Sequence, residues 1–171
     1  MGVRTFAAAA VAALSPALLA ARPAAGDCDA RVLSISRSLN ANRVVYEAVL
    51  DEAGAFDPHH PLRIYWLLVE RSGAREGLNL FEKGVYGYTV DAAPGGEVSV
   101  RLKARRSLPI RLRMVDGCPR AFAEIEGREA RLDRVWVQLE GGGLLTPKVS
   151  YLELFGFDLE TFEAVRERLT P

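Results

Sequence analysis

The chain has two histidines, His59 and His60, the side chains best suited to proton transfer or metal binding near neutral pH. They are adjacent, so their side chains point in different directions, and they lie in a loop bounded by Pro58 and Pro61. The sequence holds neither an HExxH motif nor another spaced set of metal ligands. We therefore predict that both histidines are surface-loop residues and that the chain has no metal site.

Motifs for nucleophilic catalysis or phosphate binding are also missing. No GxSxG motif is present, and the three glycines at residues 141–143 lack the helix start and Lys-Ser/Thr pair of a phosphate loop. Carboxylate pairs such as Glu47 and Asp51 fit solvated strand faces, because acid-base catalysis needs two carboxyl groups in one cleft. We identify no catalytic residue and no cofactor, and we predict a turn or bulge at residues 141–143.

A concentration of basic residues lies in the middle of the chain. Alternation places Arg101 and Lys103 on one face of a predicted strand, and Arg111 and Arg113 on the solvent face of the next. These four residues are candidate binding residues, since together they form a cationic patch able to meet an anionic polymer or an acidic ligand. The simpler interpretation is an ordinary solvent-exposed strand face whose charges are balanced by acids such as Glu97. The binding patch and the ordinary face both stay open.

Aromatic residues supply a second set of candidates. Tyr46, Trp66 and Tyr86 can line a ligand pocket, because such pockets are mostly apolar with a few polar groups. Aromatic residues in these contexts more often fill a core. The sequence does not separate a pocket from a core.

Alternating apolar and polar residues predict the scaffold that must position these side chains. Turn signals recur at the spacing typical of a barrel or sandwich of short strands, and Asp116-Gly117 is a strong hairpin signal. We predict turns at residues 40–42 and 94–96. We predict strands at residues 31–36, 43–51, 62–70, 86–90, 97–103, 110–115, 121–125, 130–140 and 149–154.

One short helix interrupts the strands. Asn79 and Glu82 have the spacing of a capping box, in which each side chain accepts a hydrogen bond from the other residue's backbone. Leu78, Phe81 and Val85 then fall on one face at helical spacing. The tail at residues 158–169 fits either a helix or a strand hairpin by pattern alone.

The first 26 residues predict a secretory signal peptide. Arg4 precedes an apolar run from Phe6 to Leu19, and small residues follow Pro23. The run is short for a membrane anchor, which needs about 20 apolar residues, and Asp27 argues against lipid attachment at Cys28. We expect cleavage near Ala25 or Gly26, a periplasmic or secreted protein, and one domain at residues 27–171 without a membrane span.

Export bears on the two cysteines, Cys28 and Cys118, because thiols tend to pair in oxidising compartments. Only one intramolecular bridge is possible, and we favour that disulfide over two free thiols.

The net charge gives no support to two classes of partner. Basic and acidic residues number 22 each, and removing residues 1–26 takes away Arg4 and Arg22, which leaves a net charge of −2. Nothing in this balance favours nucleic acid, which would require a basic stripe. A nearly neutral surface also disfavours binding to anionic membranes.

Several segments, in order, resemble a family known as domain of unknown function 4833. The resemblance covers nearly all of the mature chain. It implies no activity, substrate or catalytic residue, but it favours a final hairpin in which Phe162 stands where the family usually has Gly. The segments are Ser36–Glu47, Pro61–Trp66, Glu82 with Val85-Tyr86-Gly87, Gln138–Gly143 with Pro147, and Tyr151–Gly156.

These observations predict an all-β fold with one short helix, an antiparallel barrel or sandwich of about nine or ten strands. We expect an exported, non-enzymatic module that binds a ligand or an envelope partner. The alternative is a small exported hydrolase acting on an envelope polymer, which would need two converging carboxyl groups, or one with a histidine, in a cleft.

Overall fold

The structure, a computed structural model, describes residues 28–91, 97–141 and 148–171. The predicted signal peptide, the predicted turn at residues 94–96 and most of the glycine run lie outside these residues. The described part contains the helix α1 (Leu80–Tyr86), the 3-10 helix η1 (Val69–Arg71) and eleven strands. These are β1 (Arg31–Arg37), β2 (Asn40–Ala48), β3 (Leu62–Leu68), β4 (Ala74–Gly77), β5 (Tyr88–Asp91), β6 (Val98–Leu102), β7 (Arg105–Val115), β8 (Cys118–Ile125), β9 (Arg128–Glu140), β10 (Lys148–Asp158) and β11 (Ala164–Leu169).

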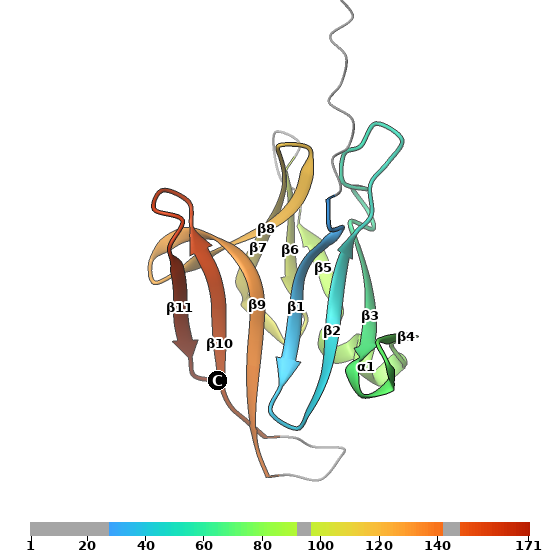
Figure 1. Ribbon diagram of the computed structural model, residues 1–171, viewed down its shortest axis with the longest axis vertical. Helices are drawn as coiled ribbons and strands as arrows, with labels where there is room; N and C mark the ends of the chain where they lie inside the picture. Colours follow the sequence, from blue (N-terminus) through green and yellow to red (C-terminus); the bar gives the residue numbers. More distant parts are fainter. Residues whose placement is uncertain (1–27, 92–96, 142–147) are drawn as a thin grey trace, which may run out of the picture.

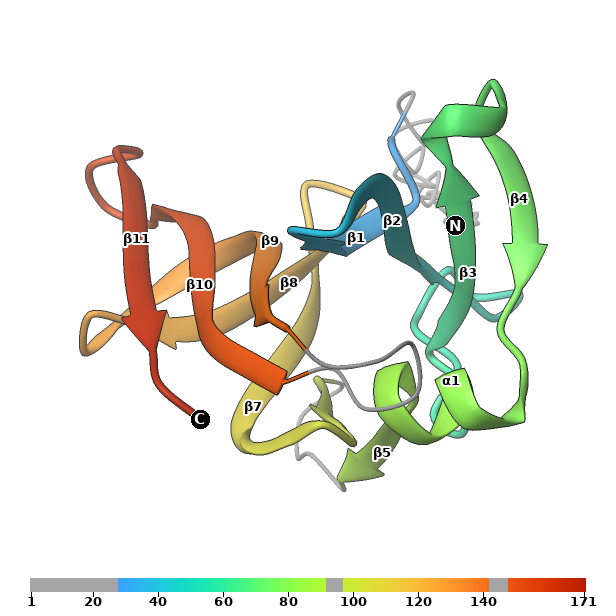
Figure 2. The same cartoon turned by 90° about the horizontal axis from the view of Figure 1, so that it is seen from below.

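All eleven strands belong to one sheet. Nine follow the order β4-β3-β2-β1-β9-β8-β7-β6-β5, while β10 pairs with β9 and β11. The path of nine strands curls into a half-barrel (Figure 1), and Figure 2 looks into its lower end. The predicted all-β class with one short helix is therefore confirmed.

The long strand β9 shares one of its edges between two partners. Residues 128–132 pair antiparallel with β8, and residues 134–137 pair parallel with β1. Its other edge pairs with β10 from Ala130 to Glu140. Asp133 lies between the two stretches, so β8 and β1 diverge at that residue and the sheet forks.

The inner face of the half-barrel forms the core. In β6 the alternating residues Val98, Val100 and Leu102 are buried, as predicted. Ile110 and Leu112 of the neighbouring β7 are completely buried as well. Alternation works here because successive side chains of a strand point to opposite faces of the sheet.

Cys28 and Cys118 form the predicted disulfide, with their Cα atoms 5.5 Å apart. It joins the segment before β1 to the first residue of β8. Cys118 directly follows the Asp116-Gly117 turn, where Val115 pairs with Cys118 and both turn residues have positive φ, at 51° and 78°. Positive φ at both central residues is typical of a two-residue type I′ hairpin, so that prediction is confirmed.

Several local predictions were wrong. The first turn lies at Ser38-Leu39, and β2 already begins at Asn40, which pairs with Arg37. The third strand was predicted at residues 62–70, but β3 ends at Leu68 and η1 begins at Val69. Strand β4 was not predicted, because all four of its residues are exposed and it therefore lacks an apolar alternation.

The helix prediction is confirmed in its start but not in its packing. Asn79 and Glu82 form the capping box in both directions. Leu78 is buried, but Phe81 is 63% exposed, so the predicted apolar face is only partly used. Tyr86, predicted in a strand, is the last residue of α1. No helix in the described ranges is long and apolar enough to cross a bilayer.

The tail forms the hairpin of β10 and β11, as the family resemblance favoured. Phe162 has φ of 58°, the left-handed conformation that Gly adopts most easily. The hairpin therefore forms although a bulky residue stands at the position where Gly fits best.

Candidate functional site

The predicted cationic patch is largely neutralised by neighbouring acids. Arg101 Nε lies 2.5 Å from Asp91, and Arg111 and Arg113 both contact Glu129. Arg113 Nε also lies 3.1 Å from Glu97. Lys103 is exposed in the turn after β6. The structure thus brings the four candidates near one another but leaves little uncompensated charge there, and their binding role stays a prediction.

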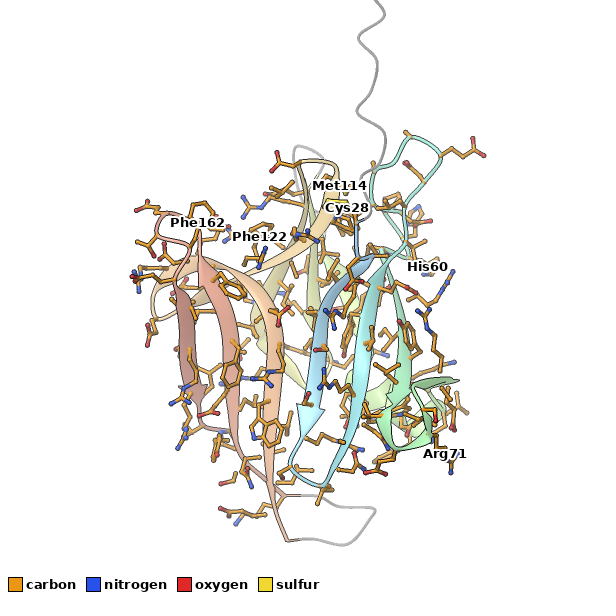
Figure 3. All side chains as sticks on the ribbon, viewed as in Figure 1. Cys28, His60, Arg71, Met114, Phe122 and Phe162 are labelled. Atoms are coloured by element: carbon orange, nitrogen blue, oxygen red, sulfur yellow. A yellow bond between two sulfur atoms is a disulfide. The ribbon has the colours of Figure 1, made fainter. Side chains whose placement is uncertain are left out.

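The two histidines lie in an exposed loop (Figure 3), with His60 on the opposite side of the view from Phe162. Their backbone N–H groups donate to Asp57 Oδ1 at 2.8 and 2.7 Å. These bonds, first that from His60 and then that from His59, lower the pKa of Asp57. Within the described ranges, no three His, Cys, Asp or Glu side chains are grouped so that they could hold a metal ion.

Of the three aromatic candidates, Tyr46 and Trp66 both contact Tyr86. Tyr46 is completely buried, and its hydroxyl donates to the Tyr86 carbonyl at 2.7 Å. Burial first, and the nearby Tyr86 second, raise the pKa of Tyr46. Trp66 is also buried and meets Tyr86 edge to face, with 5.4 Å between ring centroids. Tyr46 and Trp66 are therefore core residues that support Tyr86.

Tyr86 is one wall of an apolar pocket of about 210 Å³. The pocket lies between α1, the turn after β6, and strands β1, β7, β9 and β10. Figure 2 shows α1, β1, β7, β9 and β10 around the lower end of the half-barrel. Most of the lining is aliphatic, including Val135 and Val137 of β9 and Leu152 and Leu154 of β10. Its described lining includes no acidic residue and no histidine.

Two arginines supply the charge in this apolar lining. The Arg37 guanidinium lies 4.4 Å above the Trp66 ring, and its Nη1 donates to the Tyr86 hydroxyl at 3.3 Å. Arg105 Nη1 donates to the Thr170 carbonyl at 3.2 Å. A guanidinium packed over an aromatic face is held in place, so Arg37 is oriented before any ligand arrives.

Both arginines have a polar atom without a partner. Four buried side-chain polar atoms lack a hydrogen bond in the described structure: Nε of Arg37, Arg105 and Arg113, and Oε2 of Glu47. Arg113 Nε lies 3.1 Å from Glu97, and Glu47 Oε2 lies 3.9 Å from Arg63, so those two have an oppositely charged neighbour. The remaining two atoms, on Arg37 and Arg105, belong to residues that line the same pocket.

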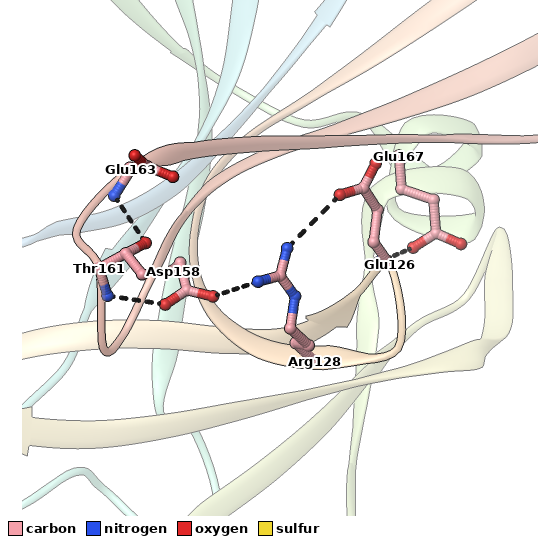
Figure 4. Close-up of polar contacts among 6 residues, drawn as sticks. All are labelled: Glu126, Arg128, Asp158, Thr161, Glu163 and Glu167. Atoms are coloured by element: carbon pink, nitrogen blue, oxygen red, sulfur yellow. Dashed lines mark hydrogen bonds and ion pairs between the residues drawn. The ribbon is translucent and has the colours of Figure 1, made fainter.

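The last hairpin is held by a polar network (Figure 4). Asp158 is buried, accepts from the backbone N–H groups of Thr161 and Glu160 at 2.9 and 2.8 Å, and pairs with Arg128 at 3.1 Å. The bond from Thr161, followed by that from Glu160, lowers the pKa of Asp158. These contacts already account for Asp158, so we assign it a structural role.

The model of the family described as domain of unknown function (DUF4833) matches residues 33–168. The chain belongs to this family. No curated protein and no solved structure matches the chain. Two glycines in the resembling segments of this DUF4833 chain have a clear physical reason: a Cβ on Gly87 would collide with the Lys83 carbonyl, and one on Gly156 with the Arg131 carbonyl.

The segments that carry the DUF4833 resemblance each supply residues to the pocket or directly beneath it. Ser36–Glu47 supplies Arg37, Pro61–Trp66 supplies the ring below that arginine, and the third segment supplies Tyr86. The C-terminal segments supply Leu139, Leu152 and Leu154.

The sequence predicted Tyr86 as a pocket candidate but not Arg37 or Arg105, although Arg105 belongs to the basic concentration in the middle of the chain. A sign of the pocket was present, because Val135, Val137 and Leu139 alternate along a predicted strand. The two arginines carried no such sign, since only the fold brings residues so far apart in the chain to one pocket.

Proposed function

We propose that this protein is an exported, non-enzymatic binding module whose interior pocket takes a small ligand with a short apolar chain and an anionic head group. The observation that supports the pocket assignment most directly is the pair of buried Nε atoms, on Arg37 and Arg105, that lack a polar partner in the described structure. Buried polar groups in proteins are normally satisfied, so two exceptions at one pocket favour a ligand that satisfies them.

The lining sets the chemistry of the ligand. Valine and leucine side chains favour an aliphatic chain, and each methylene that leaves water contributes about 0.8 kcal/mol. A guanidinium presents a fork of N–H donors that matches a carboxylate or phosphate. Arg37 and Arg105 therefore favour an anionic head at the mouth and hydrocarbon inside.

The volume limits the length of that chain. At about 30 Å³ per water molecule in the liquid, 210 Å³ corresponds to a handful of heavy atoms. Octanoate is thus a suitable probe, because its carboxylate can reach an arginine while its alkyl chain fills the space.

Export is supported by the pattern of the first 26 residues and by the disulfide, since disulfides persist in oxidising compartments. The test is N-terminal sequencing of protein recovered outside the cytoplasm of the producing cells. We expect a new N-terminus near Ala25 or Gly26, and an intact Met1 would contradict this part of the proposal.

A hydrolase was the alternative considered from the sequence. The pocket gives it no support, because none of the described lining residues is a carboxylate or a histidine that could exchange a proton with a substrate.

Binding can be followed by tryptophan fluorescence. The chain has two tryptophans, so Trp136→Phe leaves Trp66, directly beneath Arg37, as the only reporter. We expect octanoate to change its emission and to bind more tightly than the uncharged octanol. Affinity should rise about fourfold per methylene from butanoate to octanoate.

Charge removal gives the sharper result. Hydrogen bonds to charged groups contribute about 1.5–3 kcal/mol, so Arg105→Gln should weaken octanoate binding by roughly tenfold or more and leave octanol binding unchanged. Arg37→Gln should act in the same way. The matched control Arg111→Gln, whose residue is paired with Glu129 outside the pocket, should bind octanoate like the parent. Equal binding of octanoate by parent and Arg105→Gln would reject the assignment.

A further inference from the structure

A second region of the surface gathers arginines at the point where the sheet forks. On one side of Asp133 lies a pocket of about 550 Å³, and on the other a pocket of about 170 Å³. Both pockets are lined by Arg31 and Asp133, so they adjoin one another, and we call the two together the forked groove. Its lining arginines are Arg31, Arg43, Arg120, Arg131, Arg134 and Arg166.

The groove is strongly cationic in a chain whose net charge is zero. Against six arginines, its lining contains only the carboxylates of Asp29 and Asp133. Of these acids, Asp29 pairs with Arg31 at 3.2 Å. The structure shows no ion pair between Asp133 and any described residue.

Most of these arginines are not engaged by acids. Nine of the 17 arginines in the described ranges form no ion pair there, and five of the nine line the forked groove. The predicted patch shows the opposite arrangement, because Arg101, Arg111 and Arg113 are all paired. Among the described arginines, those without an ion pair therefore lie mainly at the fork.

Two of the groove arginines are held in place by aromatic rings. The Arg134 guanidinium lies 4.3 Å from the centre of the Phe155 ring, and that of Arg131 lies 4.7 Å from the centre of the Phe157 ring. Stacking on a ring leaves the in-plane N–H donors of a guanidinium able to bind an oxyanion. These side chains can therefore bind an anion with little further loss of conformational freedom.

Two of the groove arginines lie in one row across the strands. Strand register places Ser34, Arg134, Phe155 and Arg166 side by side on β1, β9, β10 and β11. Neighbouring strands lie about 4.8 Å apart, so Arg134 and Arg166, two strands apart, are about 10 Å from each other at the backbone. An elongated ligand with repeated acidic groups suits such a row better than one small ion.

We propose that the forked groove binds an anionic glycan through its carboxylate or sulfate groups. A single-stranded nucleic acid is the less suitable polyanion, because its bases need aromatic faces on which to stack, whereas Phe155 and Phe157 each have a guanidinium over the ring. This site is separate from the interior pocket and shares no lining residue with it.

The test measures binding to immobilised heparin and to polygalacturonate, with neutral dextran and single-stranded DNA as comparison ligands. Heparin presents sulfates, whereas the acidic groups of polygalacturonate are all carboxylates. Comparing the two glycans therefore shows which acidic group the groove recognises. We expect binding to at least one of these glycans that weakens with added salt, no binding to dextran, and weaker binding to DNA. Stronger binding to DNA, or none to either glycan, would overturn the proposal.

Matched variants locate the site. Arg134→Ser with Arg166→Ser should weaken glycan binding tenfold or more, while Arg101→Ser with Arg111→Ser, which removes the same charge from the predicted patch, should change it less than twofold. Asp133→Asn removes a groove acid and should strengthen binding, a gain that misfolding cannot imitate. Equal losses in the two double variants, or no gain in Asp133→Asn, would refute a site at the fork. The groove variants should bind octanoate like the parent, which would show that their loss of glycan binding does not arise from damage to the interior pocket.

Discussion

The hydroxyl of Tyr88 bonds to both backbone groups of Leu62. It donates to the Leu62 carbonyl at 2.8 Å and accepts from the Leu62 N–H at 3.2 Å. Leu62 is the first residue of β3, beyond the stretch where β4 covers that edge, since β4 pairs only with residues 65–68. One side chain from β5 thus replaces a missing strand neighbour where the half-barrel is open.

Tyr88→Phe tests this replacement. The change leaves a backbone donor and an acceptor without their partner, and such losses cost about 1–3 kcal/mol. We expect the free energy of unfolding, measured by denaturant titration, to fall by that amount. Tyr151→Phe is the control, because no described residue forms a hydrogen bond with the Tyr151 hydroxyl. If both variants lower the free energy of unfolding by the same small amount, the Tyr88 hydroxyl does not replace a strand neighbour of Leu62.

The disulfide should contribute strongly to stability. Its cysteines are 90 residues apart, and a loop of that length corresponds to about 4–5 kcal/mol of lost chain entropy in the unfolded state, with measured values often lower. Replacing both Cys28 and Cys118 by Ser should therefore lower the free energy of unfolding by about 2–5 kcal/mol. Adding reductant should shift the denaturation midpoint of the parent but not of the double variant. A denaturation midpoint of the parent that does not change with reductant would contradict the presence of the disulfide.

Asp158 should make the last hairpin sensitive to acid. Its pKa lies below the ordinary 3.8 because the folded state favours the ionised form. The stabilisation is thus complete above the unfolded-state pKa and is lost as the pH falls through the lower native pKa. The difference in unfolding free energy between the parent and Asp158→Asn should be constant from pH 6 to pH 7 and should shrink below about pH 4.

The control for this measurement is Glu160→Gln, since the Glu160 side chain has no polar partner among the residues that the structure describes. A difference between the parent and Asp158→Asn that stays the same down to pH 2 would show that the charge of Asp158 is unimportant.

Phe162 offers a test of backbone strain. Its φ of 58° is costly for any residue with a Cβ, by about 1–2 kcal/mol, and its side chain is 80% exposed, so it gains little from packing. Phe162→Gly should remove the strain at the expense of a more flexible unfolded chain, giving a net stabilisation of about 0.5 kcal/mol. Phe162→Ala keeps the Cβ and should not stabilise. A stabilisation by Ala equal to that by Gly would point to the exposed ring instead of the backbone.

The sequence predicted features that depend on neighbours along the chain. The Asp116-Gly117 turn, the Asn79–Glu82 capping box and the alternation of β6 are local patterns, and each is confirmed. Strand β4 was not predicted, because it has no buried face and therefore no alternation of apolar and polar residues.

The two candidate sites could not be predicted from the sequence, for a different reason. Arg37 and Arg105 lie on different strands and meet only because the sheet curls. The same holds for Arg43, Arg134 and Arg166, which sequence reasoning did not single out. The basic cluster that was visible in sequence, around Arg101 and Arg111, is paired with Asp91 and Glu129, whose approach no local pattern could reveal.

The parallel pairing of β1 with β9 has a consequence for the order of events during synthesis. Ser34 is matched with Arg134, 100 residues later, so the first strand to leave the ribosome completes its ladder only when most of the chain has followed. Contacts this distant in sequence slow folding, and until they form one edge of β1 stays bare and able to pair wrongly. A nascent chain that stops short of residue 134 can form the meander from β1 to β4, but the edge of β1 that pairs with β9 remains unpaired.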